Sequence, residues 1–366
     1  MSIQKQYFGK MPDGRAVTRY ILQNENGMTA AILDWAGAIQ ELRVPDRKGG
    51  FVDVVGGFES ASQYYYGNGH QGSLIGRFGN RIKDGVFTLD GVTYTLAKNN
   101  GANHLHGGVE GYSRQFWEVT PVDGEEPALR LHYFSPDGDQ GYPGALDVTV
   151  TYTLTNENAL SIRYVATTDK ATIVNMTNHA YFNLGGFASG TVLDHELWMD
   201  ADTYLPTDEG KVPTGEIRSV SGTPFDFTVP KTVGRDYDFS NEDIRIGGGY
   251  DHCFNFVGGE TKDPVHRATL YSPKTGIEMK TFTNKPAVHL YSAGAMNNVD
   301  CPLKGGYPQN RHCFVCLETE KMPDSINQPH FNNVVLRPGE VYDYTTVYAF
   351  GIAEGSRTRA PDGGTF

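Results

Sequence analysis

Strict alternation between apolar and polar side chains is the feature that most limits the folds open to this chain. From residue 146 to residue 154 the apolar members are Leu, Val, Val, Tyr and Leu, separated by Asp and three Thr. A period of two puts the two sets on opposite faces of a half-buried β-strand. Asn156-Glu157-Asn158 then supplies a turn, and Leu160, Ile162 and Tyr164 alternate again. We therefore predict an antiparallel hairpin over residues 146–166.

A second hairpin is predicted over residues 87–96, where Asp90-Gly91 separates two alternating runs. Asp-Gly accepts the positive φ angles of a two-residue turn. Helical periodicity is scarce elsewhere, and the 44 glycines and 19 prolines fall in short turn clusters between many short runs. This pattern predicts an all-β protein with a large antiparallel architecture. Since no linker of biased composition or reliable repeat interrupts it, we predict one domain spanning residues 1–366.

The net charge limits the kinds of partner that this protein can bind. The 43 acidic and 31 basic residues give a net charge of −12, which opposes binding to nucleic acid or to an anionic membrane and suits a neutral or cationic small molecule. The N-terminal residues lack a signal-peptide core and no later run is long enough to cross a bilayer, so we predict a cytoplasmic protein without membrane contacts.

The four cysteines are too few and too clustered for a disulfide framework, and we expect reduced thiols. Cys313 and Cys316 have a zinc-like spacing, but in a strand a separation of three puts the sulfurs on opposite faces. No second pair of this spacing exists to complete a zinc site. Buried small hydrophobes are the better interpretation.

The densest polar chemistry lies in residues 178–186, Asn-His-Ala-Tyr-Phe-Asn-Leu-Gly-Gly. A strand here would place His179, Tyr181 and Asn183 on one face, with Ala180, Phe182 and Leu184 on the other. A lone histidine in such a place is more often a satisfied core residue than a catalytic one. A functional interpretation therefore requires partners from other stretches.

Other stretches offer such partners. His104 and His106 would share one face of an extended segment, which leaves a metal pair open as a minor alternative. Glu318 and Glu320 share a strand face, where repulsion between carboxylates would raise at least one pKa, unless the pair is a solvated acidic edge. Arg81 is a candidate donor to a ligand oxygen.

The last two stretches are less specific. Arg77 is as readily a surface charge as a functional residue. Asp251 and His252 follow a long polar loop over residues 226–249, and neighbours in an extended segment point opposite ways, so only one of them should face a site. Together these residues suit a reaction with one base and one acid on opposite sides of a small neutral substrate.

Several motifs resemble the aldose 1-epimerase (galactose mutarotase) family. In chain order they are Gly76-Arg77-x-x-Asn80-Arg81-Ile82, Asn103-x-Leu105-His106-Gly107-Gly108, Asn178-His179-x-Tyr181-Phe182-Asn183-Leu184, Leu205-Pro206-Thr207-Asp208, Pro213-Thr214-Gly215, Pro224-Phe225-Asp226-Phe227, Gly249-Tyr250-Asp251-His252, and Leu317-Glu318-Thr319 followed by Pro323-Asp324-Ser325-x-Asn327. The match is ordered and spans most of the chain.

The resemblance implies a β-supersandwich with an open cleft, no cofactor or metal, and interconversion of the α and β anomers of a free aldohexose. Carried over residue by residue, Glu318 would take the proton from the C1 hydroxyl and His179 would protonate the ring oxygen, assisted by His106. Arg81 and Asp251 would hold sugar hydroxyls. Asn80 and Phe282 would line the site.

Ordinary ionisation agrees with these roles. A carboxylate with a pKa of about 4.3 and an imidazole with a pKa of about 6.5 can be ionised and protonated, respectively, near neutral pH. No metal or redox centre is needed for this chemistry.

Two positions depart from the family pattern. The family usually has Gln where this chain has Glu320, and the Gln of its Gln-x-Tyr-Thr segment is replaced in His289-Leu290-Tyr291-Ser292. If Glu320 is close to Glu318 and ionised, its charge should raise the pKa of the proposed base.

Two other functions remain open at this stage. A glycoside hydrolase could pair Glu318 with Asp251 or Glu320, although it leaves both histidines without a role. A carbohydrate-binding β-sandwich could use the same polar groups for binding and stack Tyr64, Tyr65 and Tyr66 on the sugar. In each case the expected partner is a small sugar, and the protein is a monomer or a homodimer.

Overall fold

The computed structural model describes residues 2–67, 70–122 and 124–353. Within these ranges 42% of the chain is strand and 8% helix, and every ladder between strands is antiparallel, so the all-β prediction is confirmed. The ends of the predicted domain, residue 1 and residues 354–366, lie outside the described residues.

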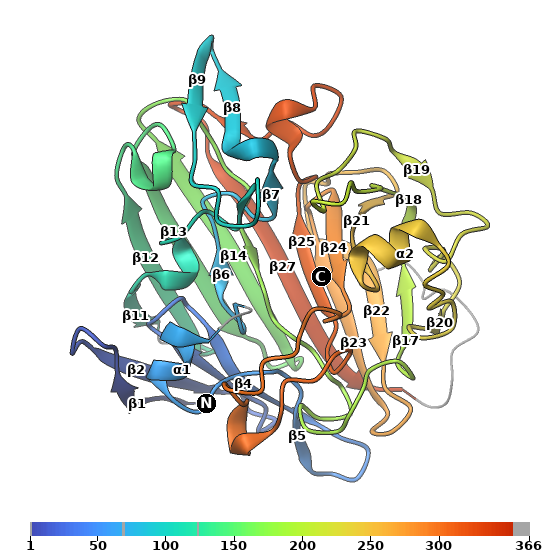
Figure 1. Ribbon diagram of the computed structural model, residues 1–366. Helices are drawn as coiled ribbons and strands as arrows, with labels where there is room; N and C mark the ends of the chain where they lie inside the picture. The colour runs from blue at the N-terminus through green and yellow to red at the C-terminus, as the bar shows by residue number, and fades with distance from the viewer. Residues whose placement is uncertain (1, 68–69, 123, 354–366) are drawn as a thin grey trace.

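The N-terminal part forms a sheet of its own in strand order β1-β2-β3-β4-β5, seen as the blue arrows low in Figure 1. Its strands are β1 (Ser2–Lys10), β2 (Ala16–Gln23), β3 (Thr29–Leu33), β4 (Ile39–Pro45) and β5 (Phe51–Asp53). Leu22, Ile32 and Leu42 are fully buried and join the main hydrophobic core. This burial attaches the sheet to the rest of the molecule.

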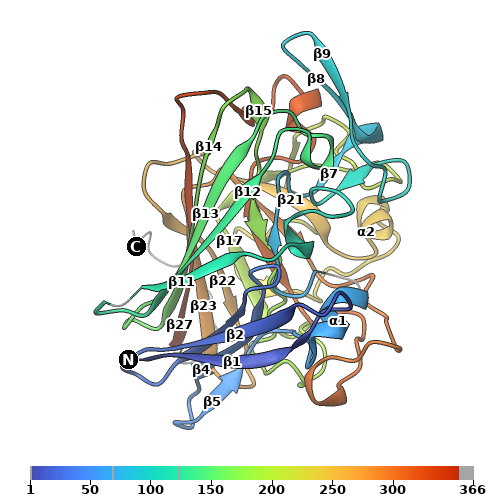
Figure 2. The same ribbon diagram turned by 90° about the vertical axis from the view of Figure 1, so that its left-hand side faces the viewer.

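The largest sheet within the described residues has the order β11-β12-β13-β14-β27-β23-β22-β17-β20, of which β12, β13 and β14 are seen side by side in Figure 2. They are β11 (Glu118–Val122), β12 (Ala128–Ser135), β13 (Leu146–Leu154), β14 (Ala159–Thr168), β27 (Tyr342–Ile352), β23 (Ile277–Thr283), β22 (Val265–Tyr271), β17 (Glu196–Met199) and β20 (Lys231–Thr232). The hairpin predicted over residues 146–166 is β13 and β14, paired in one continuous register.

A third sheet, in the order β19-β18-β21-β24-β25, lies over part of this large sheet. Its strands are β19 (Arg218–Ser219), β18 (Ala201–Tyr204), β21 (Asp251–Phe256), β24 (Ala287–Tyr291) and β25 (Cys316–Glu320). Contacts between β25 and β27 join the two layers: the Tyr348 hydroxyl donates to the Leu317 carbonyl at 2.8 Å, and Thr319 and Thr346 share a hydroxyl hydrogen bond. Apolar side chains fill the space between them.

Four short ladders complete the strands that the structure describes. They are β6 (Leu74–Ile75) with β16 (Thr177–Asn178), β7 (Arg81–Ile82) with β10 (His104–Leu105), β8 (Val86–Leu89) with β9 (Val92–Thr95), and β15 (Thr172–Ile173) with β26 (Val335–Leu336). The hairpin predicted around Asp90-Gly91 is β8 and β9, which projects at the top of Figure 1. Asp90 and Gly91 have φ angles of 50° and 79°, as the predicted turn requires.

Helical structure is short. The α-helices in the described ranges are α1 (Ala61–Tyr66) and α2 (Glu242–Gly247), and single 3₁₀ turns occur at Lys83–Gly85, Tyr112–Arg114, Asp139–Gly141, Lys304–Gly306 and Ser325–Asn327. The stretch 226–249, predicted to be one long loop, contains β20 and α2, which Asn241 caps by accepting from the Ile244 amide. No helix in the described part of the chain has the length and apolar character to span a bilayer.

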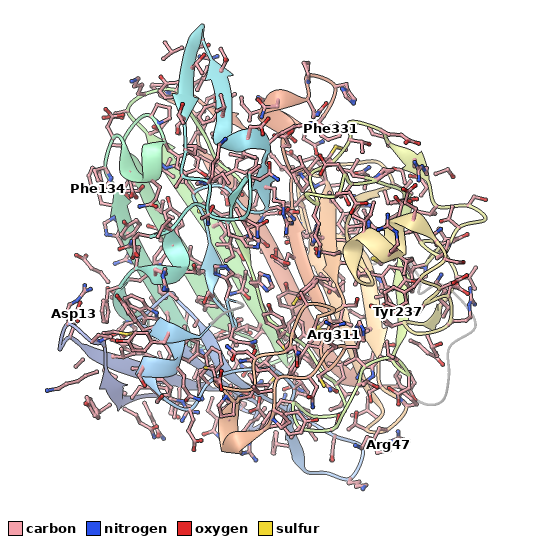
Figure 3. The ribbon with its side chains drawn as sticks, viewed as in Figure 1. Asp13, Arg47, Phe134, Tyr237, Arg311 and Phe331 are labelled. Carbon is pink, nitrogen blue, oxygen red and sulfur yellow. The ribbon has the colours of Figure 1, made fainter. Side chains whose placement is uncertain are left out.

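Charged side chains such as Asp13 and Arg47 lie at the periphery of the molecule in Figure 3, whereas Arg77 is buried. The Arg77 guanidinium donates to the carbonyls of Pro143 and Gly144 at 2.8 Å each and to the Ser135 hydroxyl at 2.7 Å. Arg77 therefore stabilises the packing of buried segments. It is neither a surface charge nor a residue that lines the cavity described below. The four cysteines are free thiols, and Cys313 and Cys316 are buried as predicted.

Candidate active site

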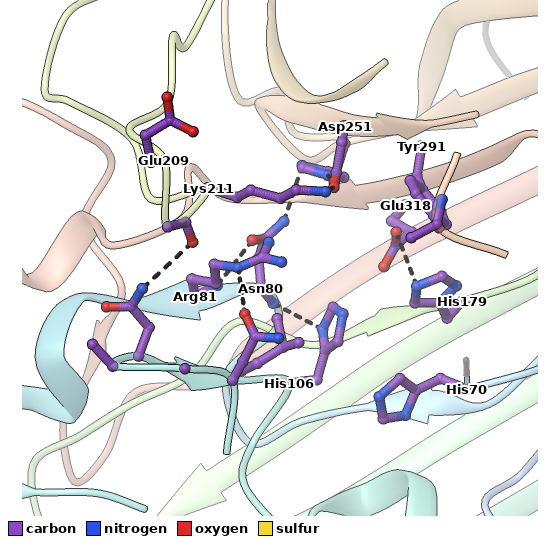
Figure 4. A pocket seen from close by; sticks show the side chains of 18 of the residues that line it. His70, Asn80, Arg81, His106, His179, Glu209, Lys211, Asp251, Tyr291 and Glu318 are labelled. Carbon is purple, nitrogen blue, oxygen red and sulfur yellow. Dashed lines mark hydrogen bonds and ion pairs between the residues drawn. The ribbon is translucent and has the colours of Figure 1, made fainter. Parts of the chain in front are cut away.

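A cavity of about 630 Å³ opens at the exposed face of the third sheet (Figure 4). Its lining comes from β7, β10, β21, β24 and β25 and from the segment after β16. The titratable or amide-bearing residues predicted for the site that line it are Asn80, Arg81, His106, His179, Asp251 and Glu318. Side chains far apart in sequence thus converge on one pocket of a size suited to a small ligand.

Glu318 reaches the cavity because of its place in β25. Leu317 and Thr319 face the large sheet, so strand alternation turns Glu318 the other way. Its side chain is only 2% exposed, and Oε1 lies 3.5 Å from Nε2 of His179. The predicted base and acid are therefore adjacent.

The stretch that carries His179 is not the regular strand that was predicted. After β16 ends at Asn178, the chain continues as an irregular extended segment in which Phe182 forms isolated bridges to Val55 and Val315. His179 and Tyr181 line the cavity, while Phe182 packs in the core. Asn183, predicted to share the polar face, instead donates to the carbonyls of Gly190 and Cys313 and stays out of the lining.

Burial reverses the ordinary ionisation of this pair. Burial, with the nearby His70 and His289, lowers the pKa of His179 to about 3. Burial raises the pKa of Glu318 well above its usual range, aided by the charges of Glu320 and Asp251 and opposed by Arg81. The pKa of each group is thus displaced away from the expected state of an ionised carboxylate beside a protonated imidazole, because a low-dielectric environment disfavours both charges. Burial favours the neutral forms of both groups, with their single proton on Glu318.

This state still suits acid–base chemistry. An ionised Glu318 with a protonated His179 contains the same single proton, moved across 3.5 Å. Adding a second proton removes the base, and losing the proton removes the acid. The pair is competent in the pH range in which it holds one proton.

His106 has a fixed tautomer. The backbone N–H of Asn80 donates to Nδ1 of His106 at 3.1 Å, so the neutral ring carries its hydrogen on Nε2. The pKa of His106 is well below its usual value because of burial and the neighbouring His70 and His179. His106 is thus a neutral hydrogen-bond donor to the cavity, as the role of assisting at an oxygen requires.

His104 does not line the cavity with His106. β10 ends at Leu105 and His106 has a φ of 51°, which breaks the strand alternation on which a shared face depended. The His104 ring donates from Nδ1 to the Ala97 carbonyl at 2.8 Å and accepts from the Tyr142 hydroxyl at 2.6 Å. The alternative of a metal pair at His104 and His106 is therefore wrong.

His106, His179 and Glu318 form a different group of possible metal ligands. Single ligand-capable atoms of His106, His179 and Glu318 lie within 4.8 Å of one another. A metal-binding histidine normally donates a hydrogen bond from its second nitrogen, whereas Nδ1 of His106 accepts one and leaves Nε2 protonated. The His106 tautomer does not fit metal ligation, and the absence of a metal stays a prediction.

Arg81 and Asp251 line the cavity on the side of β7 and β21. Arg81 donates from Nε to the Asn100 side chain at 3.0 Å, and its fork remains directed at the pocket (Figure 4). Asp251 accepts from His289 and from Lys211 at 2.8 Å each. Burial would raise the pKa of Asp251, but these two partners and Arg81 hold it well below its usual range. Asp251 is therefore an ionised acceptor, while His252 points the other way, against Phe225.

Asn80 and Phe282 were both predicted to line the site, but only Asn80 does. Asn80 lines the cavity, but its amide nitrogen is already held by His289 at 2.9 Å and Glu320 at 3.3 Å. Phe282 is a wrong prediction: it lies in β23 of the large sheet, packed with Ala159 and Val347 and outside the lining. Its position in a neighbouring sheet could not be read from sequence order.

Sequence reasoning also missed residues. His70 lines the cavity beside His106 and His179, with ring centroids 5.0 and 6.0 Å away, and burial and Arg114 lower its pKa to about 4. Lys211 enters from the loop after β18. A histidine in the glycine-rich stretch 67–72 was the one available signal for His70; nothing marked Lys211. Conversely, Tyr64, Tyr65 and Tyr66 belong to α1 and line no part of this cavity.

An antiparallel β-sandwich with a buried carboxyl–imidazole pair, flanked by fixed donors and acceptors, defines an enzyme that moves protons on a small polar molecule. Comparison with known proteins narrows this class. The family model described as aldose 1-epimerase matches residues 18–349. The chain belongs to the aldose 1-epimerase family, an isomerase family acting on carbohydrates.

Individual relatives match this chain over nearly their full lengths. Galactose mutarotase from Bos taurus is 40% identical over 358 residues, covering 96% of this chain and 100% of that protein. Aldose 1-epimerase from Escherichia coli is 38% identical, covering 94% and 97%. The solved structure of an aldose epimerase homologue from C. elegans has a TM-score of 0.82 at 30% identity, covering 96% and 100%. Galactose 1-epimerase from Lactobacillus acidophilus has a TM-score of 0.83 at 27% identity, covering 97% and 100%. The predicted mutarotase-like fold is thereby confirmed.

Proposed function

We propose that Glu318 and His179 are the catalytic pair of this aldose 1-epimerase, acting on free aldohexoses such as glucose or galactose. The observation that carries the proposal is the 3.5 Å approach of Glu318 Oε1 to His179 Nε2 inside the cavity. With the shared proton on His179, Glu318 takes the proton of the C1 hydroxyl. His179 gives its proton to the ring oxygen as the bond from C1 to that oxygen breaks. The pair again holds one proton, and the sugar is an open aldehyde.

Ring closure runs the same steps in reverse. Rotation about the C1–C2 bond presents the opposite face of the aldehyde to the ring hydroxyl. The hydroxyl returns its proton to His179 as it attacks C1, and Glu318 returns a proton to the former carbonyl oxygen. The product is the other anomer, and the pair is as it began. No electron donor or acceptor takes part.

The neighbours have supporting roles in this proposal. His106 would donate from Nε2 to the ring oxygen, since its tautomer is fixed by the Asn80 backbone. Arg81 would donate to sugar hydroxyls, and ionised Asp251 would accept from them. Such contacts would hold the C1 hydroxyl and the ring oxygen next to Glu318 and His179.

Three broader features remain proposals. We propose that residues 1–366 form one domain, consistent with a core that includes side chains from all three large sheets. The net charge of −12 disfavours nucleic acid and membrane partners, and we propose a cytoplasmic location. The protein would act as a monomer or a homodimer.

The decisive experiment follows freshly dissolved α-D-glucose and α-D-galactose by polarimetry, with an aryl glycoside assayed in parallel. Faster mutarotation without glycoside cleavage supports the epimerase. Cleavage would support a hydrolase, and binding without either reaction would support a binding module.

The role assignment is tested with Glu318→Gln and His179→Asn, each expected to lower the rate about 10²- to 10⁴-fold with the fold retained. Matched controls are Glu118→Gln and His132→Asn, whose side chains are 88% and 38% exposed on the large sheet. Near-wild-type mutarotation in either active-site variant would contradict the assignment.

A further inference from the structure

Along one wall of the cavity, five polar side chains form a continuous chain of contacts that starts at Lys211 and ends behind the lining at Glu320; Lys211, Asp251 and Asn80 are labelled in Figure 4. Lys211 Nζ donates to Asp251 Oδ2 at 2.8 Å, and Asp251 Oδ1 lies 2.8 Å from His289 Nε2. His289 Nδ1 lies 2.9 Å from the Asn80 amide nitrogen, which in turn donates to Glu320 Oε1 at 3.3 Å. Apart from Lys211, all of these residues are buried.

The direction of each hydrogen bond follows from the chemistry of its ends. An ionised Asp251 can only accept, so Nε2 of His289 carries the hydrogen and Nδ1 offers a lone pair. The Asn80 amide nitrogen can only donate, and Nδ1 is where it donates. One neutral tautomer of His289 satisfies both neighbours. A flipped Asn80 would break the chain, but its oxygen is already held by the Arg81 backbone N–H at 2.9 Å.

Strand pairing brings these residues together. β24 lies between β21 and β25, which places His289 opposite Cys253 on one side and Glu318 on the other. Glu320 follows Glu318 on the same face of β25, and its Oε1 lies 3.8 Å from Nδ1 of His289. The two positions at which this chain departs from the family pattern, His289 and Glu320, are therefore neighbours bridged by Asn80.

We propose that His289 is a positioning residue that orients the Asp251 carboxylate toward the sugar, and that Asn80, anchored on Glu320, fixes the tautomer of His289. This inference rests on the proposed role of Asp251 in holding sugar hydroxyls. Oδ1 of Asp251 is fixed by His289 and Oδ2 by Lys211. The carboxylate then presents its remaining lone pairs in one direction, which lowers the entropy lost when a hydroxyl binds.

The two hydrogen bonds of His289 predict which substitution at this residue is tolerated. Glutamine carries a donor nitrogen and an acceptor oxygen side by side, so His289→Gln can still donate to Asp251 and accept from Asn80. His289→Leu has similar bulk but can do neither, and it leaves two buried polar groups without their partner. Val288→Ala is the matched control, because Val288 is the fully buried neighbour in β24 that faces the hydrophobic core.

The test measures KM and kcat for mutarotation of α-D-glucose, and the dissociation constant by calorimetry, in the full-length variants. For His289→Leu we expect KM and the dissociation constant to rise about tenfold with kcat changed less than about threefold, since Asp251 holds the sugar rather than the reacting atoms. For His289→Gln we expect both constants within about twofold of wild type. Asp251→Asn combined with His289→Leu should add little to Asp251→Asn alone.

Two results would overturn the proposal. One is a His289→Leu enzyme whose KM and dissociation constant change no more than those of Val288→Ala. The other is a His289→Gln enzyme that is as impaired as His289→Leu. If His289→Leu does not fold, Asn80→Ala removes the tautomer lock from the other side and should raise the same two constants. A wild-type protein that binds glucose without mutarotating it would refute the proposed function instead, and the dissociation constants would still test the positioning role.

Discussion

The protonation state of the proposed catalytic pair makes Glu320→Gln the most informative single substitution. Glu320 is fully buried two residues beyond Glu318 on the same face of β25, and burial raises its own pKa to about 8. Glutamine matches the shape of the side chain and can still accept from Asn80, so the main change is the loss of a negative charge. That charge is one of the causes of the raised pKa of Glu318.

The size of the change in the pKa of Glu318 follows from its distance to Glu320. Alternate residues on one strand face are about 7 Å apart, and two unit charges at that distance repel by about 2.4 kcal/mol at an effective dielectric constant of about 20. This energy corresponds to about 1.7 pKa units. Both groups are buried, so solvent screens the interaction little. Removing the charge should lower the pKa of Glu318 by about one to two units.

The direction of the effect on activity follows from the number of protons that Glu318 and His179 hold together. The pair works while it holds one proton, so activity is lost at alkaline pH when Glu318 gives up that proton, and at acid pH when His179, with a pKa of about 3, gains one. Glu320 carries its negative charge above a pH of about 8, so it acts on the pKa of Glu318 in that range. We therefore expect the alkaline limb of kcat/KM to move about one to two units lower in Glu320→Gln, with the acid limb unchanged.

The assay is polarimetric mutarotation of α-D-glucose from acid to alkaline pH, corrected at each pH for the uncatalysed rate. Using kcat/KM reports the ionisation of the free enzyme, which is the state described above. Glu118→Gln, the exposed control, should reproduce the wild-type profile. An alkaline limb that stays in place, or moves upward, would refute the reasoning.

Three further predictions concern single residues. Arg77→Met should lower the free energy of unfolding by about 3 kcal/mol in urea titrations, because several buried acceptors lose their donor, and an unchanged midpoint would contradict this. Phe282→Leu should leave KM for glucose within about twofold of wild type, since Phe282 lies outside the cavity; a large rise in KM would restore it to the site. Lys211→Met should raise KM severalfold while kcat is retained, because Asp251 loses one of its two fixed partners; equal KM values would show that His289 alone suffices.

Much of the fold was predictable because it depends on local patterns. The alternation before Asn156 and the Asp90-Gly91 turn specified their hairpins, since side-chain period and turn chemistry act between near neighbours. Strand alternation also put Glu318 and Glu320 on one face. The irregular path of the His179 segment was not predictable, because its bridges to Val55 and Val315 join residues more than a hundred positions away.

The amino-acid sequence by itself determined the class of fold and the family, and six of the seven residues predicted for the site line one cavity. Tertiary structure decided which of them act on one another: it excluded Phe282, turned His104 away from His106, added His70 and Lys211, and joined His289 to Asp251 and Asn80. It also decided the directions in which the pKa values of Glu318 and His179 are displaced. Residue type sets only the ordinary pKa, whereas burial and neighbouring charges, which arise when distant strands pack together, raise the pKa of Glu318 and lower that of His179.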